Sequence, residues 1–83
     1  MRVATVPYSE DILLASGRSP AEFEQELRTL VAAKLFELRR LSIGKAAELA
    51  GLPKLRFMEE LAHLEIPVIN LSDEQIADEL RDP

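Results

Sequence analysis

The longest amphipathic pattern in this chain runs from about residue 20 to residue 40. Apolar side chains recur there with the 3.6-residue period of an α-helix, and Lys34 is the one polar residue among them. Ser19, Pro20 and Glu22 form a start signal, because serine caps a helix, proline suits its first position and glutamate completes a capping box. The apolar stripe comprises Phe23, Leu27, Leu30, Val31, Leu35, Leu38 and Leu41.

The same predicted helix also carries apolar residues outside this stripe. Ala32, Ala33 and Phe36 widen its apolar surface beyond one face. A surface helix that is apolar over so broad an arc usually has a second surface to pack on. We therefore expect the chain to form a homodimer.

Shorter patterns on both sides predict further helices. Ser9 can cap a helix that ends at Gly17, with two acidic residues in its first turn where the helix dipole favours negative charge. Ser42 can cap a helix that ends at Gly51, and Pro53 can open the next one.

Two segments near the ends favour β-strands. Residues 2–7 are rich in β-branched side chains and end at Pro7, and residues 66–71 have a similar apolar character. Residues 72–75 form another capping box that opens a final short helix. The prediction is a mainly α single domain, residues 1–83, with a short N-terminal strand, a helical core containing a helix-turn-helix-like hairpin, and a short C-terminal strand and helix.

Residues 42–64 carry the spacing of a helix-turn-helix. That motif needs a small residue where its helices cross, a glycine in the turn and apolar residues that lock the second helix. Ala47, Gly51 and Phe57 meet these needs, whereas the usual last apolar position falls on Glu60, one residue before Leu61. The hairpin can serve DNA binding, or it can be simply part of the core.

Charge is distributed unevenly, although the net charge is −5. Residues 34–56 hold six basic and two acidic residues, whereas residues 59–83 hold eight acidic residues and one arginine. Such a split indicates two different partner surfaces. Only Lys54 is an obvious reader of DNA on the second helix, and Glu59 opposes the phosphate backbone. The candidate DNA-binding residues of this middle segment are Arg39, Arg40, Lys45, Lys54 and Arg56.

Residues 1–41 suggest another route to DNA. A strand followed by two helices resembles the dimerisation half of a ribbon-helix-helix protein, in which paired N-terminal strands enter the major groove. Arg2 and Thr5 would then read bases. Equally, the strand can serve dimerisation alone.

The residue inventory disfavours catalysis. There is no cysteine, His63 is the only histidine, and the serines are explained as helix caps. The three glycines are isolated and form no phosphate-binding loop. We expect a binding protein rather than an enzyme, without metal or cofactor. No signal peptide or long apolar run is apparent, so we expect it in the cytoplasm and not in a membrane.

Two blocks of sequence resemble a known family. Residues 42–51 (Ser-Ile-Gly-Lys-Ala-Ala-Glu-Leu-Ala-Gly) and residues 66–70 (Ile-Pro-Val-Ile-Asn) look like those of uncharacterised protein family 0175. Its members are small prokaryotic proteins, many of which resemble antitoxins encoded beside PIN-like ribonuclease toxins. The resemblance implies a toxin–antitoxin system in which the chain represses transcription at its own operator and neutralises the toxin.

The acidic C-terminal segment, residues 65–83, is the candidate surface for that toxin. An acidic segment would meet the basic RNA path of a ribonuclease, and Arg81 would reach the carboxylates of its metal site. The alternative is a protein-interaction adaptor that does not bind DNA. The candidate partner-binding residues are Ile66, Val68, Ile69, Leu71, Ile76, Leu80 and Arg81.

Overall fold

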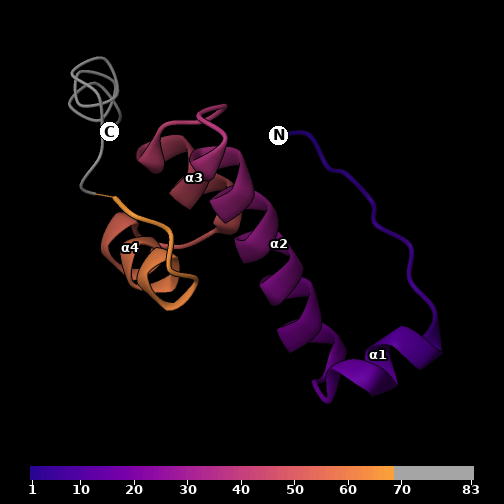
Figure 1. The fold of residues 1–83 in the computed structure, drawn as a ribbon. Coiled ribbons are helices and arrows are strands. Elements are labelled where there is room, and N and C mark those ends of the chain that lie inside the picture. Colours follow the sequence, from indigo (N-terminus) through magenta and orange to yellow (C-terminus); the bar gives the residue numbers. More distant parts are fainter. Residues whose placement is uncertain (69–83) are drawn as a thin grey trace.

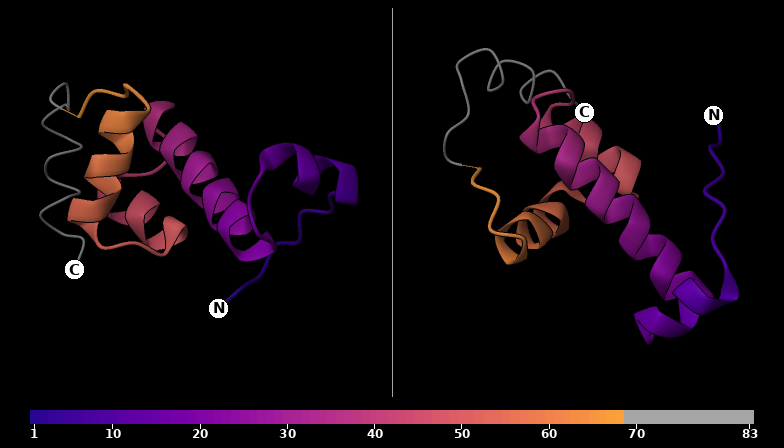
Figure 2. Two further views of the ribbon diagram at one scale, coloured as in Figure 1. Left: turned by 90° about the horizontal axis from the view of Figure 1, so that it is seen from below. Right: turned by 45° about the vertical axis from the view of Figure 1, so that its right-hand side comes forward.

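The computed structural model describes residues 1–68, which form four helices joined by short loops (Figure 1). These are α1 (Glu10–Ser16), α2 (Pro20–Glu37), α3 (Ile43–Ala50) and α4 (Lys54–His63). Helix α2 contacts each of the other three. In Figures 1 and 2 it separates α4 on one side from the N-terminal segment on the other. Within residues 1–68, no helix combines the length and apolar character that crossing a membrane requires.

The predicted helix starts at Ser9, Ser19 and Ser42 are confirmed. Ser9, Ser19 and Ser42 each accept a hydrogen bond from a backbone N–H three residues later. At Ser19 the capping box is complete, since the carboxylate of Glu22 also accepts from the serine backbone N–H at 3.0 Å. That hydrogen bond holds the pKa of Glu22 below its usual value. Local side-chain hydrogen bonds therefore set where α1, α2 and α3 begin.

The core lies where α2, α3 and α4 meet. Five alanines allow the helices to approach closely, and Phe57 and Leu61 of α4 fill the remaining space with no exposed surface. Polar Thr29 joins this core at its edge. The buried apolar residues are Ala32, Ala33, Phe36, Ile43, Ala46, Ala47, Ala50, Phe57 and Leu61.

The predicted strands are wrong, although the mainly α class is correct. Residues 2–7 form no strand, Ile66–Val68 is irregular, and no sheet exists anywhere in residues 1–68. A β-strand forms only when a neighbouring segment offers free backbone N–H and C=O groups for hydrogen bonding. The element beside the N-terminal segment is α2, and its backbone groups are already hydrogen-bonded within the helix. The N-terminal strand on which the ribbon-helix-helix interpretation of residues 1–41 rests is therefore absent from the structure. Residues 69–71 and the predicted final helix lie outside the described part of the chain.

Candidate nucleic-acid interface

Helices α3 and α4 form the predicted hairpin around a three-residue connection, residues 51–53. Gly51 adopts the left-handed conformation with φ 73°. Its backbone N–H donates to Glu48 O at 3.0 Å, and the N–H of Leu52 donates to Ala47 O at 3.0 Å. These bonds satisfy carbonyls that the end of a helix leaves without partners.

The last apolar residue that packs α4 against the core is Leu61, and not the residue at position 60 where the usual helix-turn-helix pattern places it. Phe57 and Leu61 are fully buried, while Glu60 stays partly exposed at the rim. Ala47 is buried as expected for the position where the two helices cross. The one-residue mismatch in the sequence pattern therefore leaves the packing intact, because α4 still turns two large apolar residues toward α3.

Two polar residues of α2 hold the turn between α3 and α4, and the sequence analysis missed both. The side-chain amide of Gln25 donates to Ala50 O at 2.8 Å and to the Thr29 hydroxyl at 3.1 Å. The guanidinium of Arg28 donates from Nε to Leu49 O at 3.1 Å. These donors cap the C-terminal carbonyls of α3, where positive charge also suits the helix dipole. One signal was available, since Gln25 and Thr29 continue the alanine face of α2 at helical spacing.

Arg28 also explains why the turn is tightly shaped. A Cβ placed on Gly51 would lie 3.0 Å from Nη1 and 3.1 Å from Nη2 of this arginine. The positive φ favours glycine at this position, and a Cβ there would also make the guanidinium shift slightly. Helix α2 in this way fixes the angle at which α4 leaves α3.

One group of candidate DNA-binding residues precedes and begins α3. Arg39 and Arg40 are exposed in the loop after α2, and Arg39 has φ 62°. Helix α2 ends earlier than predicted, because the N–H of Arg40 folds back to Leu35 O at 2.8 Å. Lys45 follows in α3 and lies 3.6 Å from the carboxylate of Glu48.

A second group begins α4. Lys54 is the first residue of this helix, and Arg56 Nη1 lies 3.4 Å from Oε1 of Glu59. Helix α3 has eight residues and a length of about 12 Å, so the loop before it and the start of α4 lie near its opposite ends. The structure thus brings five candidate residues to one hairpin, in two groups, and in each group an acidic neighbour offsets one positive charge.

Arg2 and Thr5 do not join these groups. They lie in the N-terminal segment, on the other side of α2 from α4 (Figure 1). There they line a groove of about 610 Å³ together with Leu27, Val31 and Leu49. The second predicted route to DNA is therefore spatially separate from the hairpin.

The first two candidate partner-binding residues are tied to the core. Ile66 and Val68 are partly buried against it, and the N–H of Ile66 donates to Leu61 O at 2.9 Å. This packing anchors the chain after α4. The remaining candidates, Ile69, Leu71, Ile76, Leu80 and Arg81, lie outside the described residues.

Residues of metal or acid–base chemistry do not gather in this part of the molecule. His63 is exposed at the end of α4. No cluster of three or more His, Asp or Glu side chains suited to a metal ion occurs within residues 1–68.

Comparison with known proteins identifies the family of this chain. The family model described as "Uncharacterised protein family (UPF0175)" matches residues 1–82. A UPF0175 protein of Aeropyrum pernix is 39% identical over 61 residues, which cover 74% of this chain and 67% of that protein. No solved structure matches the chain.

Proposed function

Because the chain belongs to the uncharacterised protein family UPF0175, whose description gives no activity, we propose a function from the geometry of the chain itself. It is an antitoxin-like protein that binds operator DNA through α3 and α4 and neutralises a PIN-like ribonuclease through its acidic C-terminal segment. The observation that carries the proposal is the hairpin braced by α2, with basic residues at both ends of α3.

The DNA half of the proposal follows from how such hairpins bind. The second helix of a helix-turn-helix enters the major groove with its N-terminal residues, and here those are Lys54 and Arg56. The loop before the first helix approaches the phosphates, and here it carries Arg39 and Arg40. Lys54 and Arg56 directly follow the turn that Gln25 and Arg28 hold in place, whereas Arg39 and Arg40 lie before the other end of α3.

The toxin half rests on charge. Residues 69–83 contain five acidic residues and one basic residue. A ribonuclease must guide RNA along a positively charged path, which an acidic segment can occupy in its place. In this proposal Arg81 supplies a guanidinium to the carboxylates of the toxin's metal site.

The DNA half is tested by titrating the purified chain against the region upstream of its own gene at two salt concentrations. Lys54→Ala should weaken binding several-fold and reduce its salt dependence, because one phosphate or base contact is lost. Arg2→Ala is the matched control, since it removes one positive charge from the far side of α2. Equal effects of the two variants, or binding that salt does not weaken, would contradict the proposal.

A specific observation favours a second candidate, the adaptor that binds only protein. Glu48 and Glu59 lie against Lys45 and Arg56 and offset their charge, and the chain as a whole is acidic. The same titration separates the two candidates. The adaptor predicts no complex with DNA even at low salt, while binding to the toxin persists.

The toxin half is tested by co-expression with the nuclease encoded beside the gene. Replacing Asp78 and Glu79 by Asn and Gln should reduce neutralisation, because the complementary charge is lower. The matched control replaces Glu10 and Asp11, another adjacent acidic pair, which lies in α1. If the two double variants neutralise equally well, the C-terminal acids are not the toxin-binding surface.

A further inference from the structure

The side of α2 that faces the N-terminal segment, away from α4, is apolar and largely uncovered. We define this outer face by Leu27, Val31 and Leu38, the last of which is the C-cap of the helix. The exposed fractions of Val31 and Leu38 are 51% and 56%. A contiguous row of large aliphatic side chains on a helix of 18 residues is a typical contact surface for another helix.

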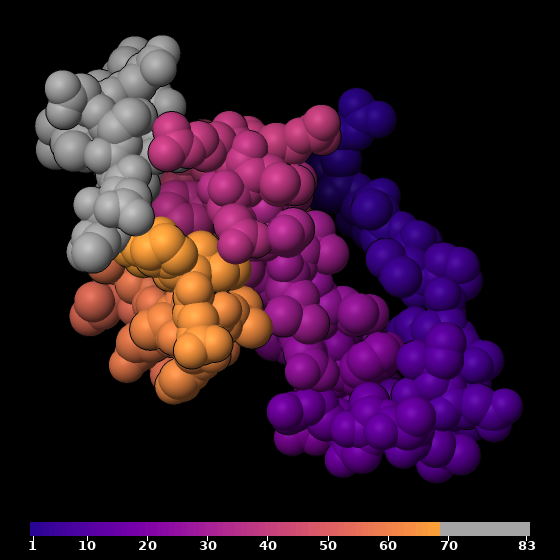
Figure 3. All heavy atoms as spheres, in the orientation of Figure 1, coloured from indigo at the N-terminus to yellow at the C-terminus, as the bar shows by residue number. Residues whose placement is uncertain are grey.

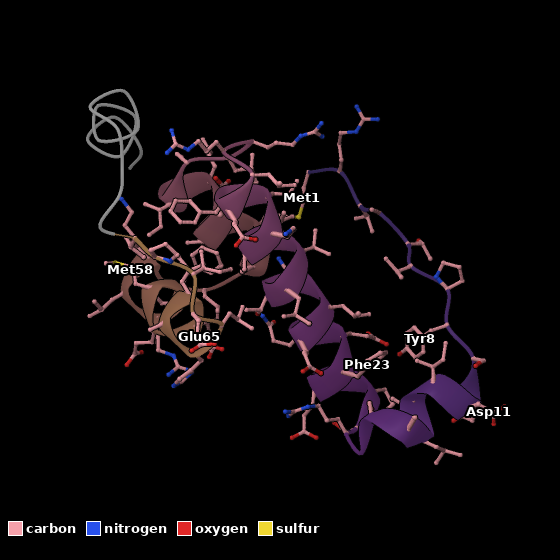
Figure 4. The ribbon with its side chains drawn as sticks, viewed as in Figure 1. Met1, Tyr8, Asp11, Phe23, Met58 and Glu65 are labelled. Atoms are coloured by element: carbon pink, nitrogen blue, oxygen red, sulfur yellow. The ribbon has the colours of Figure 1, made fainter. Side chains whose placement is uncertain are left out.

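The N-terminal segment forms a wall beside this face without covering it. Val3 and Val6 remain exposed, and a hollow separates the segment from α2 (Figure 3). Tyr8 holds the end of this segment against α2. Its hydroxyl donates to Glu24, and its ring packs edge-on against Phe23 with the ring centroids 5.0 Å apart (Figure 4). The resulting groove contains Leu27 and Val31 and stays open to solvent.

Charge along α2 makes the outer face complementary to a reversed copy of itself. Beside the outer face, the first half of the helix carries Glu24 and the second half carries Lys34, whose ammonium also lies 2.9 Å from Glu37. The loop that follows the helix adds Arg39 and Arg40. An antiparallel second α2 brings each acidic half against a basic half. A parallel copy would place like charges together, which disfavours that orientation.

The spacing of residues selects one register. Glu24, Leu27, Val31 and Lys34 are separated by three, four and three positions, a series that reads the same in both directions. In an antiparallel twofold pair, Leu27 therefore meets Val31 of the other copy, and Glu24 meets Lys34. The contacts of one half repeat in the other, as a closed dimer requires.

We propose that a second copy of this chain docks its α2 antiparallel on the outer face, in the groove beside the N-terminal segment. Leu27 and Val31 form the centre of this interface, and two Glu24–Lys34 pairs flank it. The pairing does not depend on DNA or on a toxin. It leaves α4 on the other side of α2, with α3 reaching the edge of the groove at Leu49, so a dimer presents two copies of α4.

The first test measures the mass of the full-length chain by sedimentation over a range of concentrations. Wild type should be dimeric, and Val31→Glu should raise the dimer dissociation constant roughly tenfold or more, because it buries an unpaired charge. Leu55→Glu is the matched control, since Leu55 is 74% exposed on α4 and lies off this face. Helicity by circular dichroism should be unchanged in both variants.

The second test addresses the register. Glu24→Lys and Lys34→Glu should each weaken the dimer roughly fivefold, and the double variant should regain most of that loss because the pairs are restored with opposite sign. A double variant weaker than either single one excludes this register.

Other occupants of the groove give different results. If the chain's own residues 69–83 cover the outer face, wild type is monomeric and Val31→Glu lowers its unfolding temperature. If another protein covers it, wild type is monomeric and Val31→Glu leaves that temperature unchanged. Either outcome overturns the proposal.

Discussion

The two faces of α2 use apolar residues in opposite ways. Its inner face, Thr29, Ala32, Ala33 and Phe36, is buried against the other helices of the core. Its outer face carries the larger aliphatic side chains and remains substantially exposed. The face with the larger aliphatic side chains is therefore not the one that forms the core of the chain.

The difference shows that close approach, and not hydrophobicity alone, selected the packed face. Ala32 and Ala33 lie in the same buried cluster as Ala46, Ala47 and Ala50 of α3. Small side chains let the backbones of the two helices come near enough for dense contacts. Leucines at these positions would hold the helices apart, so the stripe of large residues is left for a surface elsewhere.

The largest expected effect removes the one large side chain of the inner face. Phe36→Ala should lower the free energy of unfolding by about 3–5 kcal/mol, since Phe36 is buried and its loss leaves a cavity. Leu38→Ala, on the outer face, should cost less than about 0.5 kcal/mol. Denaturant unfolding at low protein concentration measures both. Similar losses would abolish the distinction between the faces.

A smaller effect comes from enlarging each face. Ala33→Leu should destabilise the chain by about 1–3 kcal/mol, because the alanine site has no room for a larger side chain. Val31→Leu should leave unfolding at low concentration nearly unchanged, since its surroundings are open. Thermal unfolding checks the pair, and a tolerated leucine at position 33 would show that the helix crossing is loose.

The turn that the inner side of α2 supports should respond next. Gly51→Ala should cost about 1–2 kcal/mol, because alanine is strained at positive φ and would press on the Arg28 guanidinium. Gly17→Ala shares the strain, with φ 69°, but meets no atom within 4 Å. The excess cost at position 51 therefore measures the contact with Arg28. An equal cost at both positions would mean that the guanidinium moves aside freely.

The smallest expected effect on stability concerns the capping box at the start of α2. The hydrogen bond from the Ser19 backbone lowers the pKa of Glu22 from its ordinary value of 4.5. This carboxylate therefore contributes stability above pH 4.5, and the contribution is lost as the pH falls through its lowered pKa. Unfolding curves between pH 3 and 6 should show a slightly steeper decline for wild type than for Glu22→Gln. Parallel declines would indicate that the capping box contributes nothing.

The sequence by itself determined where the helices begin and much of the candidate site. The serine caps, Gly17 and Gly51 act through hydrogen bonds and backbone conformations that span three or four residues. A short stretch of sequence is therefore enough to predict them. The hairpin followed from Ala47, Gly51 and Phe57 for the same reason. Five of the seven candidate DNA-binding residues accordingly lie on or beside that hairpin.

Only the tertiary structure decided what depends on distant neighbours. The β-branched residues 2–7 lack a pairing strand, so they form none. Gln25 caps α3 from 25 positions away, and its spacing along the alanine face of α2 shows which face it shares but not which carbonyl it meets. Which face of α2 is buried was also decided there, because both faces satisfy helical periodicity. The choice depended on how closely a second helix can approach, a property of two surfaces together rather than of either one alone.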